Sequence, residues 1–173
     1  MCRRWLNRPF GVSKHEWAYK DIPRRIVIEK LLVEDGEGKL PRDYKFYTIH
    51  GRCHIIQLDM DRFIGRKKNV YDRDWNPLDL IIGYPNGDPA PKPPNFEKML
   101  QLAEELAQDF DQVRVDLYNL DGKIYFGELT HYPGAGFLPW YPTTYAFEIG
   151  ARWTLKERYW EGNLRAENAS VYF

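Results

Sequence analysis

An Asp-Gly pair between two alternating segments constrains the fold of this chain most strongly. Asp121 and Gly122 separate QVRVDLYNL from KIYFGEL, and such pairs are typical of two-residue hairpin turns because both residues tolerate a positive φ. We therefore predict antiparallel strands over Gln112–Leu120 and Lys123–Leu129.

A second hairpin is expected earlier in the chain. DYKFYTIHGRCHIIQLDMDR contains two segments of strand-forming residues, Tyr44–Ile49 and Cys53–Met60, around the turn His50-Gly51-Arg52. A further short strand is expected over Asn69–Trp75. The stretch from Leu78 to Pro94 is rich in proline and glycine and predicts a long connection. The sheet of this chain should therefore be mainly antiparallel.

One segment has a clear helical period. Asn95 is an N-cap candidate, and the residues after it place apolar side chains on one broad helix face. These residues are Phe96, Met99, Leu100, Leu102, Ala103, Leu106, Ala107 and Phe110. A second helix is expected around Tyr145–Tyr159. Strands and helices together predict an α+β fold, in which helices pack on an antiparallel sheet.

Composition and charge exclude several classes of protein. With 173 residues, 43% of them hydrophobic, the chain suffices for one domain and is too apolar for disorder. Lys plus Arg equals Asp plus Glu at 25 each, so no overall field favours nucleic acid as a partner. Cys2 and Cys53 lack the spacing of a metal site and are expected to be free thiols. No apolar run reaches the roughly 20 residues of a membrane span, so we expect a cytoplasmic protein.

Strand alternation brings charged residues together on the hairpin of residues 112–130. Arg114, Asp116 and Tyr118 share one face of the first strand, and Glu128 on the return strand lies near their level. Magnesium binds carboxylate oxygens and arginine neutralises phosphate, so this group suits the chemistry of ATP. A solvated Asp–Arg–Glu salt-bridge cluster is the alternative explanation.

The same region carries a family resemblance. VRVDLYNLDGKIYFGELTHYPGAGF, Val113–Phe137, resembles the end of an ATP-grasp domain, where an Arg-x-Asp strand, a hairpin, a Glu-containing strand and a proline-glycine loop hold magnesium and ATP. DYKFYTIHG, the DRDWN segment and FGELTHYP together are similar to the TupA-like ATP-grasp proteins encoded among polysaccharide-biosynthesis genes. The resemblance covers about Trp5 to Leu155 and implies an ATP-grasp-like fold, present here in part.

The resemblance implies roles for residues of the hairpin. Asp116 and Glu128 would be the magnesium ligands, and Arg114 would bind phosphate. Thr130 stands where the general ATP-grasp pattern has asparagine. The TupA-like pattern also has threonine at this position. Its hydroxyl would be a weaker ligand, so a second metal site would be less strong than in other ATP-grasp proteins.

Residues outside the hairpin complete the implied site. Lys45, Asp61 and Arg62 fall in segments shared with the family. A lysine and an arginine near the phosphates would steady the negative charge of ATP. His131 and Tyr132 follow the second strand and would line the acceptor pocket, with packing inside the loop as the alternative.

A charged pair inside an apolar run suggests where adenine would bind. Arg25–Val33 is apolar apart from Glu29 and Lys30, which predicts a strand buried on both faces. Within it, IEKLL resembles the linker strand of ATP-grasp proteins, and Glu29, Lys30, Leu31 and Leu32 would contact the base. An edge strand whose two charges face water is the alternative.

The activity implied by the resemblance is ATP-dependent ligation. A carboxylate of a small molecule or glycan precursor would be phosphorylated to an acylphosphate and captured by an amine or another nucleophile. Asp43 would meet the ribose hydroxyls of ATP, or else be an acidic turn residue. Two other functions stay open: a non-catalytic nucleotide-binding or assembly module, and a structural domain held by ion pairs of Arg114, Asp116 and Glu128.

The resemblance further predicts that the chain begins after the N-terminal α/β domain, the strand lysine and the glycine-rich flap of ATP-grasp proteins. Residues 1–33 would be the end of the central nucleotide lobe, 34–160 the C-terminal catalytic lobe and 161–173 a tail. The missing part would leave apolar surface exposed in the first of these segments.

That exposed surface is expected near Trp5, Trp17 and Ile26–Ile28. Exposed apolar patches of more than a few hundred Å² usually mark interfaces. We therefore expect either a homodimer, for which a two-fold pair is the simplest arrangement, or a separately encoded N-terminal partner.

Overall fold

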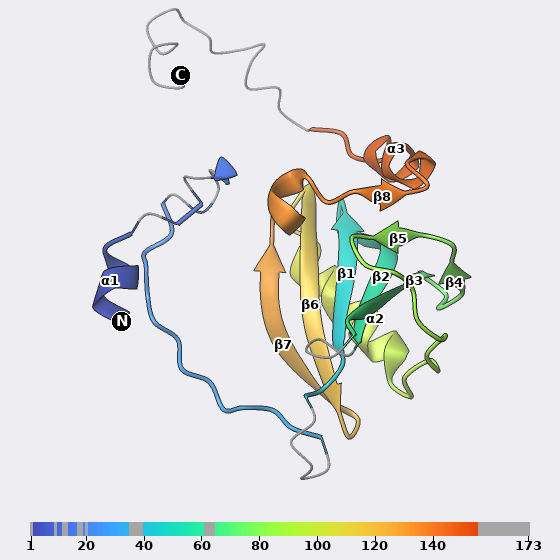
Figure 1. Ribbon diagram of the computed structural model, residues 1–173, viewed down its shortest axis with the longest axis horizontal. Coiled ribbons are helices and arrows are strands. Elements are labelled where there is room, and N and C mark those ends of the chain that lie inside the picture. The colour runs from blue at the N-terminus through green and yellow to red at the C-terminus, as the bar shows by residue number, and fades with distance from the viewer. Residues whose placement is uncertain are drawn as a thin grey trace, which may run out of the picture.

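A six-stranded antiparallel sheet forms the centre of the fold (Figure 1). The computed structural model describes residues 2–8, 10–11, 14–16, 19, 21–34, 40–60 and 65–155. The strand order is β4-β3-β2-β1-β6-β7. The strands are β1 (Asp43–Ile49), β2 (Arg52–Met60), β3 (Lys67–Asp72), β4 (Pro77–Leu78), β6 (Gln112–Leu120) and β7 (Lys123–Thr130). The predicted α+β class with a mainly antiparallel sheet is confirmed.

Both predicted hairpins are present. β1 and β2 are joined by His50 and Gly51, and β6 and β7 are joined by Asp121 and Gly122. The φ angles of these four residues are 49°, 74°, 51° and 77°. A two-residue turn with positive φ at both positions matches the twist of the strands that it connects. The turns therefore determine which residues of the paired strands lie opposite each other.

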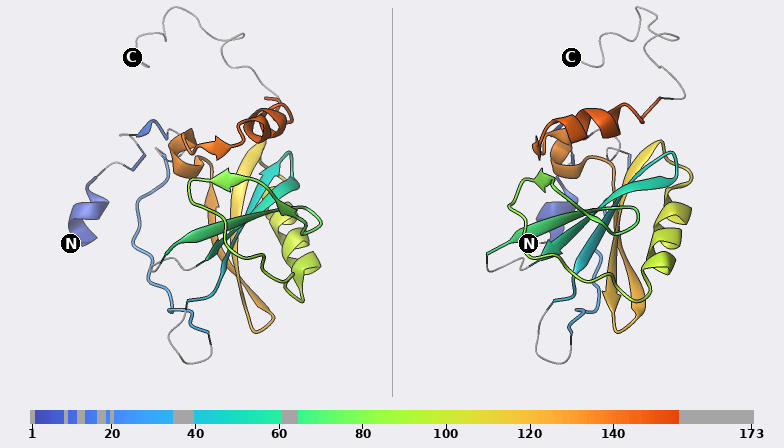
Figure 2. Two further views of the ribbon diagram at one scale, coloured as in Figure 1. Left: turned by 45° about the vertical axis from the view of Figure 1, so that its right-hand side comes forward. Right: turned by 90° about the vertical axis from the view of Figure 1, so that its right-hand side faces the viewer.

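Helix α2 (Phe96–Ala107) covers one face of the sheet (Figures 1 and 2). Its apolar side chains pack on β1, β2 and β6 to form the main core. The buried helix residues are Phe96, Met99, Leu100, Ala103 and Ala107, whereas Leu106 is exposed. Asn95 is the N-cap but makes no capping bond with its side chain. Instead its side-chain amide donates to the carbonyl oxygen of Gly122 at 2.8 Å, which ties the helix start to the β6–β7 turn.

A smaller layer covers part of the opposite face. β5 (Ile81–Ile82) pairs with β8 (Trp140–Tyr141), and α3 (Thr144–Gly150) follows β8. In Figure 2 this layer lies across one end of the sheet. The side chains that pack on Tyr47, Ile55 and Val70 there are Leu78, Leu80, Ile82, Leu138, Trp140, Tyr145 and Ile149. The rest of this sheet face carries polar side chains.

The strand predicted over Arg25–Val33 is wrong. Residues 23–33 form no regular structure, and the side chain of Ile28 is 92% exposed. A strand is stable only when its backbone groups pair with a neighbouring strand, and this segment joins neither edge of the sheet, β4 or β7. An apolar run in a sequence carries no information about whether such a partner exists.

The N-terminal segment is otherwise as exposed as expected. It contains α1 (Cys2–Leu6), and Trp5, Ile26 and Val27 are exposed. Trp17 lies outside the described residues. Whether this surface binds a second copy or another chain stays a prediction, as does the division at residues 33 and 160.

Two other elements differ in extent from their predictions. The strand expected over Asn69–Trp75 is β3, which ends at Asp72. The helix expected around Tyr145–Tyr159 is α3, which ends at Gly150, and residues 156–159 lie outside the described part of the chain. A 3-10 helix, Pro133–Gly136, precedes β8. None of the helices that the structure describes has the length and apolar character needed to cross a bilayer.

Candidate functional site

The sheet face opposite α2 carries a row of polar side chains. Alternation sends Val113, Val115 and Leu117 of β6 into the main core, so Arg114 and Asp116 lie on the other face. The strand register places Lys45 of β1 opposite Asp116, Asp116 opposite Glu128, and Arg114 opposite Thr130. The predicted level of Glu128 on the hairpin is confirmed.

Arg114 is the centre of this group. Its Nε donates to Asp116 Oδ1 at 2.6 Å, and its Nη2 donates to Asp116 Oδ2 at 2.8 Å. The same Nη2 also donates to Glu128 Oε1 at 2.8 Å and to Thr130 Oγ1 at 2.9 Å. All three residues that the resemblance implies as metal ligands therefore lie within hydrogen-bond distance of one guanidinium. The bidentate pairing with Asp116 holds that guanidinium in one orientation.

Lys45 adds a second cation to the same carboxylate. Its ammonium forms an ion pair with Asp116 and another with Asp43 at 2.6 Å. All three side chains are almost closed to solvent. The structure thus brings together five predicted site residues, which are Lys45, Arg114, Asp116, Glu128 and Thr130. Asp43, predicted to contact the ribose, joins the same group through its ion pair with Lys45.

Burial governs the protonation of this group. Burial raises the pKa of Asp116, and the neighbouring Arg114 and Lys45 act against that rise. Burial acts to lower the pKa of Arg114, but its hydrogen bonds to Asp116 and the charges of Asp116 and Glu128 together raise the pKa, so the guanidinium stays charged. Burial also raises the pKa of the Tyr47 hydroxyl to about 12, so this residue is a neutral donor to Gln57 Oε1.

The polar row extends over β2 and β3, which the sequence analysis missed. Asp59 of β2 lies opposite Lys68 of β3, and Gln57 lies beside Lys45. Arg66 Nη2 donates to Asp59 Oδ2 at 2.6 Å. Alternation within Cys53–Met60 is a signal that could have placed Gln57 and Asp59 on this face. No comparable signal indicates that Lys68 would lie opposite them.

The oxygen atoms around Arg114 suit a magnesium ion that also binds phosphate. Magnesium takes one or two protein carboxylates and completes its shell with water and phosphate oxygens. Asp116 and Glu128 supply two carboxylates, and the Glu128 side chain is 62% exposed and accessible. Within the described residues, no cluster of three or more His, Cys, Asp or Glu side chains could hold a metal by itself. The donor set therefore fits a shared site rather than an all-protein cage.

The remaining predicted residues are not gathered at this group. Glu29, Lys30, Leu31 and Leu32 lie in the irregular, exposed segment described above. Arg62, like Asp61, falls outside the residues that the structure describes.

An aromatic group lies at the end of β7. The backbone N–H of His131 donates to the hydroxyl of Tyr19 at 2.9 Å, and the Tyr19 ring contacts the rings of Phe10, His131 and Tyr132. Tyr19 thereby connects the N-terminal segment to the chain at His131, one residue after the end of β7. His131 and Tyr132 thus pack against Tyr19, in keeping with the alternative that they are packing residues of the loop. They directly follow β7, the strand that carries Glu128.

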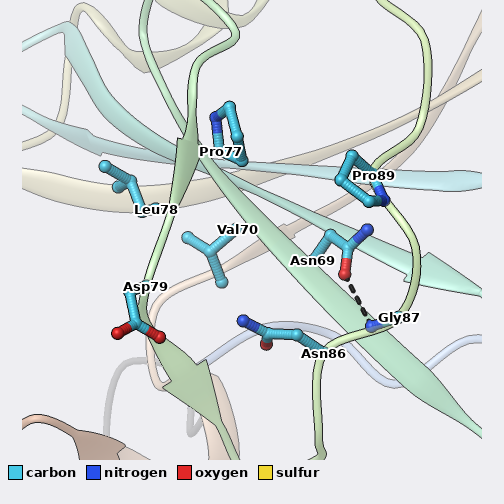
Figure 3. Close-up of a pocket in the computed structure, with 8 residues that line it drawn as sticks. All are labelled: Asn69, Val70, Pro77, Leu78, Asp79, Asn86, Gly87 and Pro89. Atoms are coloured by element: carbon cyan, nitrogen blue, oxygen red, sulfur yellow. Dashed lines mark hydrogen bonds between the residues drawn. The ribbon is translucent and has the colours of Figure 1, made fainter.

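A separate pocket of about 250 Å³ lies at the β3–β4 edge of the sheet (Figure 3). Asn69 and Val70 line it from β3, and Asn86 and Gly87 line it from the long connection. The N–H of Gly87 donates to Asn69 Oδ1 at 2.8 Å. Neither Arg114 nor the residues around it line this pocket, so it is distinct from the candidate site.

Comparison with known proteins identifies the family. A family model described as TupA-like ATPgrasp matches residues 1–154 of the 173-residue chain. No curated protein and no solved structure matches the chain. The match spans far more than half of the sequence and includes every residue of the candidate site, which confirms the resemblance seen in the motifs. The chain belongs to the TupA-like ATP-grasp family.

Proposed function

We propose that the chain binds ATP with magnesium and activates a carboxylate as an acylphosphate for capture by an amine or another nucleophile. The observation that supports this most strongly is the convergence of Asp116, Glu128 and Thr130 on the Arg114 guanidinium. Two carboxylates and an arginine on one sheet face are the groups that ATP-dependent phosphoryl transfer needs. Membership of the ATP-grasp family makes this chemistry the expected one.

Asp116 and Glu128 would hold the magnesium ion, which supplies positive charge to the transferring phosphoryl group. Arg114 would exchange its hydrogen bond to Glu128 for one to a phosphate oxygen while it keeps its bidentate bonds to Asp116. Lys45 keeps the Asp116 carboxylate ionised and oriented. These groups act by positioning and charge, and no side chain has to serve as a nucleophile.

The proposed reaction has two steps. In the first, a carboxylate oxygen of the acceptor bonds to the γ-phosphorus as the bond to the β-phosphate oxygen breaks, which releases ADP. In the second, an amine attacks the acyl carbon, phosphate leaves, and the amine gives up one proton to solvent. For this family branch, the acceptor that we propose is a small molecule or glycan precursor used in cell-surface polysaccharide synthesis.

The base of ATP would be held by Glu29, Lys30, Leu31 and Leu32, and its ribose by Asp43. The exposure of the IEKLL segment means that apolar side chains there are available to cover a base. Asp43 is bound to Lys45, so a ribose contact would share that carboxylate. Arg62 would act beside the phosphates.

A structural role for the same residues is the second candidate. The ion pairs within the group favour this role, because the carboxylate of Asp116 and the carboxylate of Glu128 each already have a cationic partner. Buried ion pairs of this kind can hold strands in register without any ligand. Under this hypothesis the chain would bind no nucleotide.

Formation of ADP by the full chain separates these functions. MgATP is incubated with panels of small carboxylates and amines, and wild type is compared with Arg114→Lys, which keeps the charge but not the planar donors. The proposal predicts acceptor-dependent ADP, reduced about 100-fold or more in the variant. ATP binding without ADP would indicate a non-catalytic nucleotide-binding module, and no binding at all would favour the structural role.

A further inference from the structure

Lys68 is a buried cation for which the proposed reaction has no use. The residue is 5% exposed, and its side chain lies on the polar sheet face, on β3. Its ammonium makes no hydrogen bond or ion pair with any residue that the structure describes. The aromatic ring of Tyr84 lies beside it, with the ring centroid 5.2 Å from Nζ. An ammonium has three donors, and burying them without acceptors is unfavourable.

The carboxylate opposite Lys68 is engaged elsewhere. Asp59 accepts from Arg66 Nη2 through Oδ2 and from the Gln57 amide through Oδ1. Burial lowers the pKa of Lys68, and the charges of Arg66, Lys45 and Arg114 lower it further, whereas Asp59 raises it. Asp59 is thus paired with Arg66, and Lys68 feels only the charge of this carboxylate.

Arg66 also has an unused donor at the same place. Its Nε is buried and has no hydrogen-bond partner in the described structure. Its guanidinium carbon lies 4.6 Å from the centroid of the same Tyr84 ring that Lys68 approaches. Tyr84 is 40% exposed and the Arg66 side chain 29% exposed, so solvent reaches both residues.

The loop that carries Tyr84 is fixed to β3. The backbone N–H of Lys68 donates to the carbonyl of Pro85 at 3.1 Å, and the N–H of Gly87 donates to Asn69. The ring is therefore held at the edge of the two cations. The side chain of Tyr84 also interacts with Arg66 by a hydrogen bond, whereas its ring gives the Lys68 ammonium no oxygen acceptor.

We propose that Arg66 and Lys68, bordered by the Tyr84 ring, form a binding site for a carboxylate or phosphate group of the substrate other than the nucleotide. Both groups offer several oxygen atoms, and lysine and arginine bind either. The assignment to the second substrate rests on the proposed function.

The distance from the nucleotide site supports this assignment. β3 is separated from β6 by β2 and β1, so the two sites lie roughly 14 Å apart at the backbone, three strand spacings. They share one sheet face. A substrate that reacts beside Arg114 and carries a second negative group could contact both.

Nuclear magnetic resonance of the lysine side chains tests the site directly. The full chain is labelled with 13C at lysine Cε, and the Lys68 signal is identified by its absence in Lys68→Gln. Malonate and inorganic phosphate are added separately at constant ionic strength. We expect a saturable shift of the Lys68 signal by at least one of them, with an affinity at least fivefold weaker in Arg66→Gln. Lys67→Gln removes an exposed charge from the neighbouring position and should bind like wild type.

Each result decides between ligand classes or against the site. Saturation by malonate alone indicates a carboxylate substrate, and saturation by phosphate alone indicates a phosphorylated one. No saturation by either, or an equal response in Lys67→Gln and Arg66→Gln, overturns the site. Displacement of the anion by MgATP would assign it to the nucleotide and overturn the inference. If MgATP binds and neither anion does, this inference fails alone; if an anion binds and MgATP does not, the proposed function fails instead.

Discussion

Lys45 of β1 and Asp116 of β6 are directly opposed in the sheet and form an ion pair that is nearly closed to solvent. Arg114 binds both oxygens of the same carboxylate. The negative charge of Asp116 is therefore paired with two positive charges, those of Lys45 and Arg114. The site depends on the pairing of β1 with β6, two strands that are distant in sequence. The predictions below follow from this arrangement and from the contacts that maintain it.

Removal of the lysine should destabilise the fold. Lys45→Met leaves the buried carboxylates of Asp43 and Asp116 without their shared cation. Loss of one partner of a buried ion pair costs about 3–5 kcal/mol. Urea unfolding of the variant should show a loss in this range, whereas Lys98→Met on the exposed side of α2 should change the free energy of unfolding by less than about 0.5 kcal/mol. A loss below about 1 kcal/mol for Lys45→Met would mean that the pair contributes little.

The turn between β6 and β7 should be sensitive to a single methyl group. Gly122 has a φ of 77°, and an added Cβ would meet open space there, so Gly122→Ala introduces backbone strain without a clash. A left-handed residue other than glycine costs roughly 1–2 kcal/mol. Gly150→Ala is the control, because it also meets open space but has no positive φ. Thermal unfolding should show a lower midpoint temperature for Gly122→Ala than for Gly150→Ala. Equal midpoint temperatures would contradict the assigned turn conformation.

A carboxylate of α2 completes the hydrogen bonding of β2. The register of β1 and β2 shifts beside Thr48, and the N–H of the buried Cys53 donates to Glu104 Oε1 at 3.0 Å. Glu104→Ala leaves this N–H without an acceptor, which should lower the free energy of unfolding by about 1–3 kcal/mol. Glu105→Ala, on the exposed side of the helix, should change it by less than about 0.5 kcal/mol. Equal losses in the two variants would mean that the bond to Cys53 is unimportant.

The same glutamate should make stability depend on pH. Burial acts to raise the pKa of Glu104, but hydrogen bonds from Arg73 and Cys53 outweigh burial and hold it below its ordinary 4.5. The unfolded chain then binds the proton more tightly, so the stabilisation is complete above pH 4.5 and is lost as the pH falls through the folded-state pKa. The difference in unfolding free energy between wild type and Glu104→Gln should therefore shrink from neutral to acidic pH. A difference that stays constant or grows would contradict this assignment.

Local signals account for the part of the fold that the sequence could predict. The Asp121-Gly122 pair and the alternation around Arg114 depend on neighbouring residues only, and so does the apolar period of α2. These signals were sufficient to predict that Glu128 lies near Asp116 on the paired strand. The family motifs added the role expected of each residue, which alternation alone cannot supply.

Non-local pairing explains what the sequence could not show. The sequence around Ile28 resembles a buried strand, yet none of the described strands pairs with it. Lys68 reaches the polar face because β3 pairs with β2 in a particular register. Neither the alternation within one strand nor a short motif reveals which residues of two strands will lie opposite each other.

The magnesium dependence of ATP binding tests the central claim most directly. Calorimetry of the wild type should show affinity for ATP at least tenfold higher with magnesium than with a chelator, because Asp116 and Glu128 would bind the ion together with the phosphates. Glu128→Gln should lose this difference while the free energy of unfolding changes little, since the side chain is 62% exposed. Equal ATP affinity with and without magnesium in the wild type, or no binding at millimolar ATP, would contradict the account.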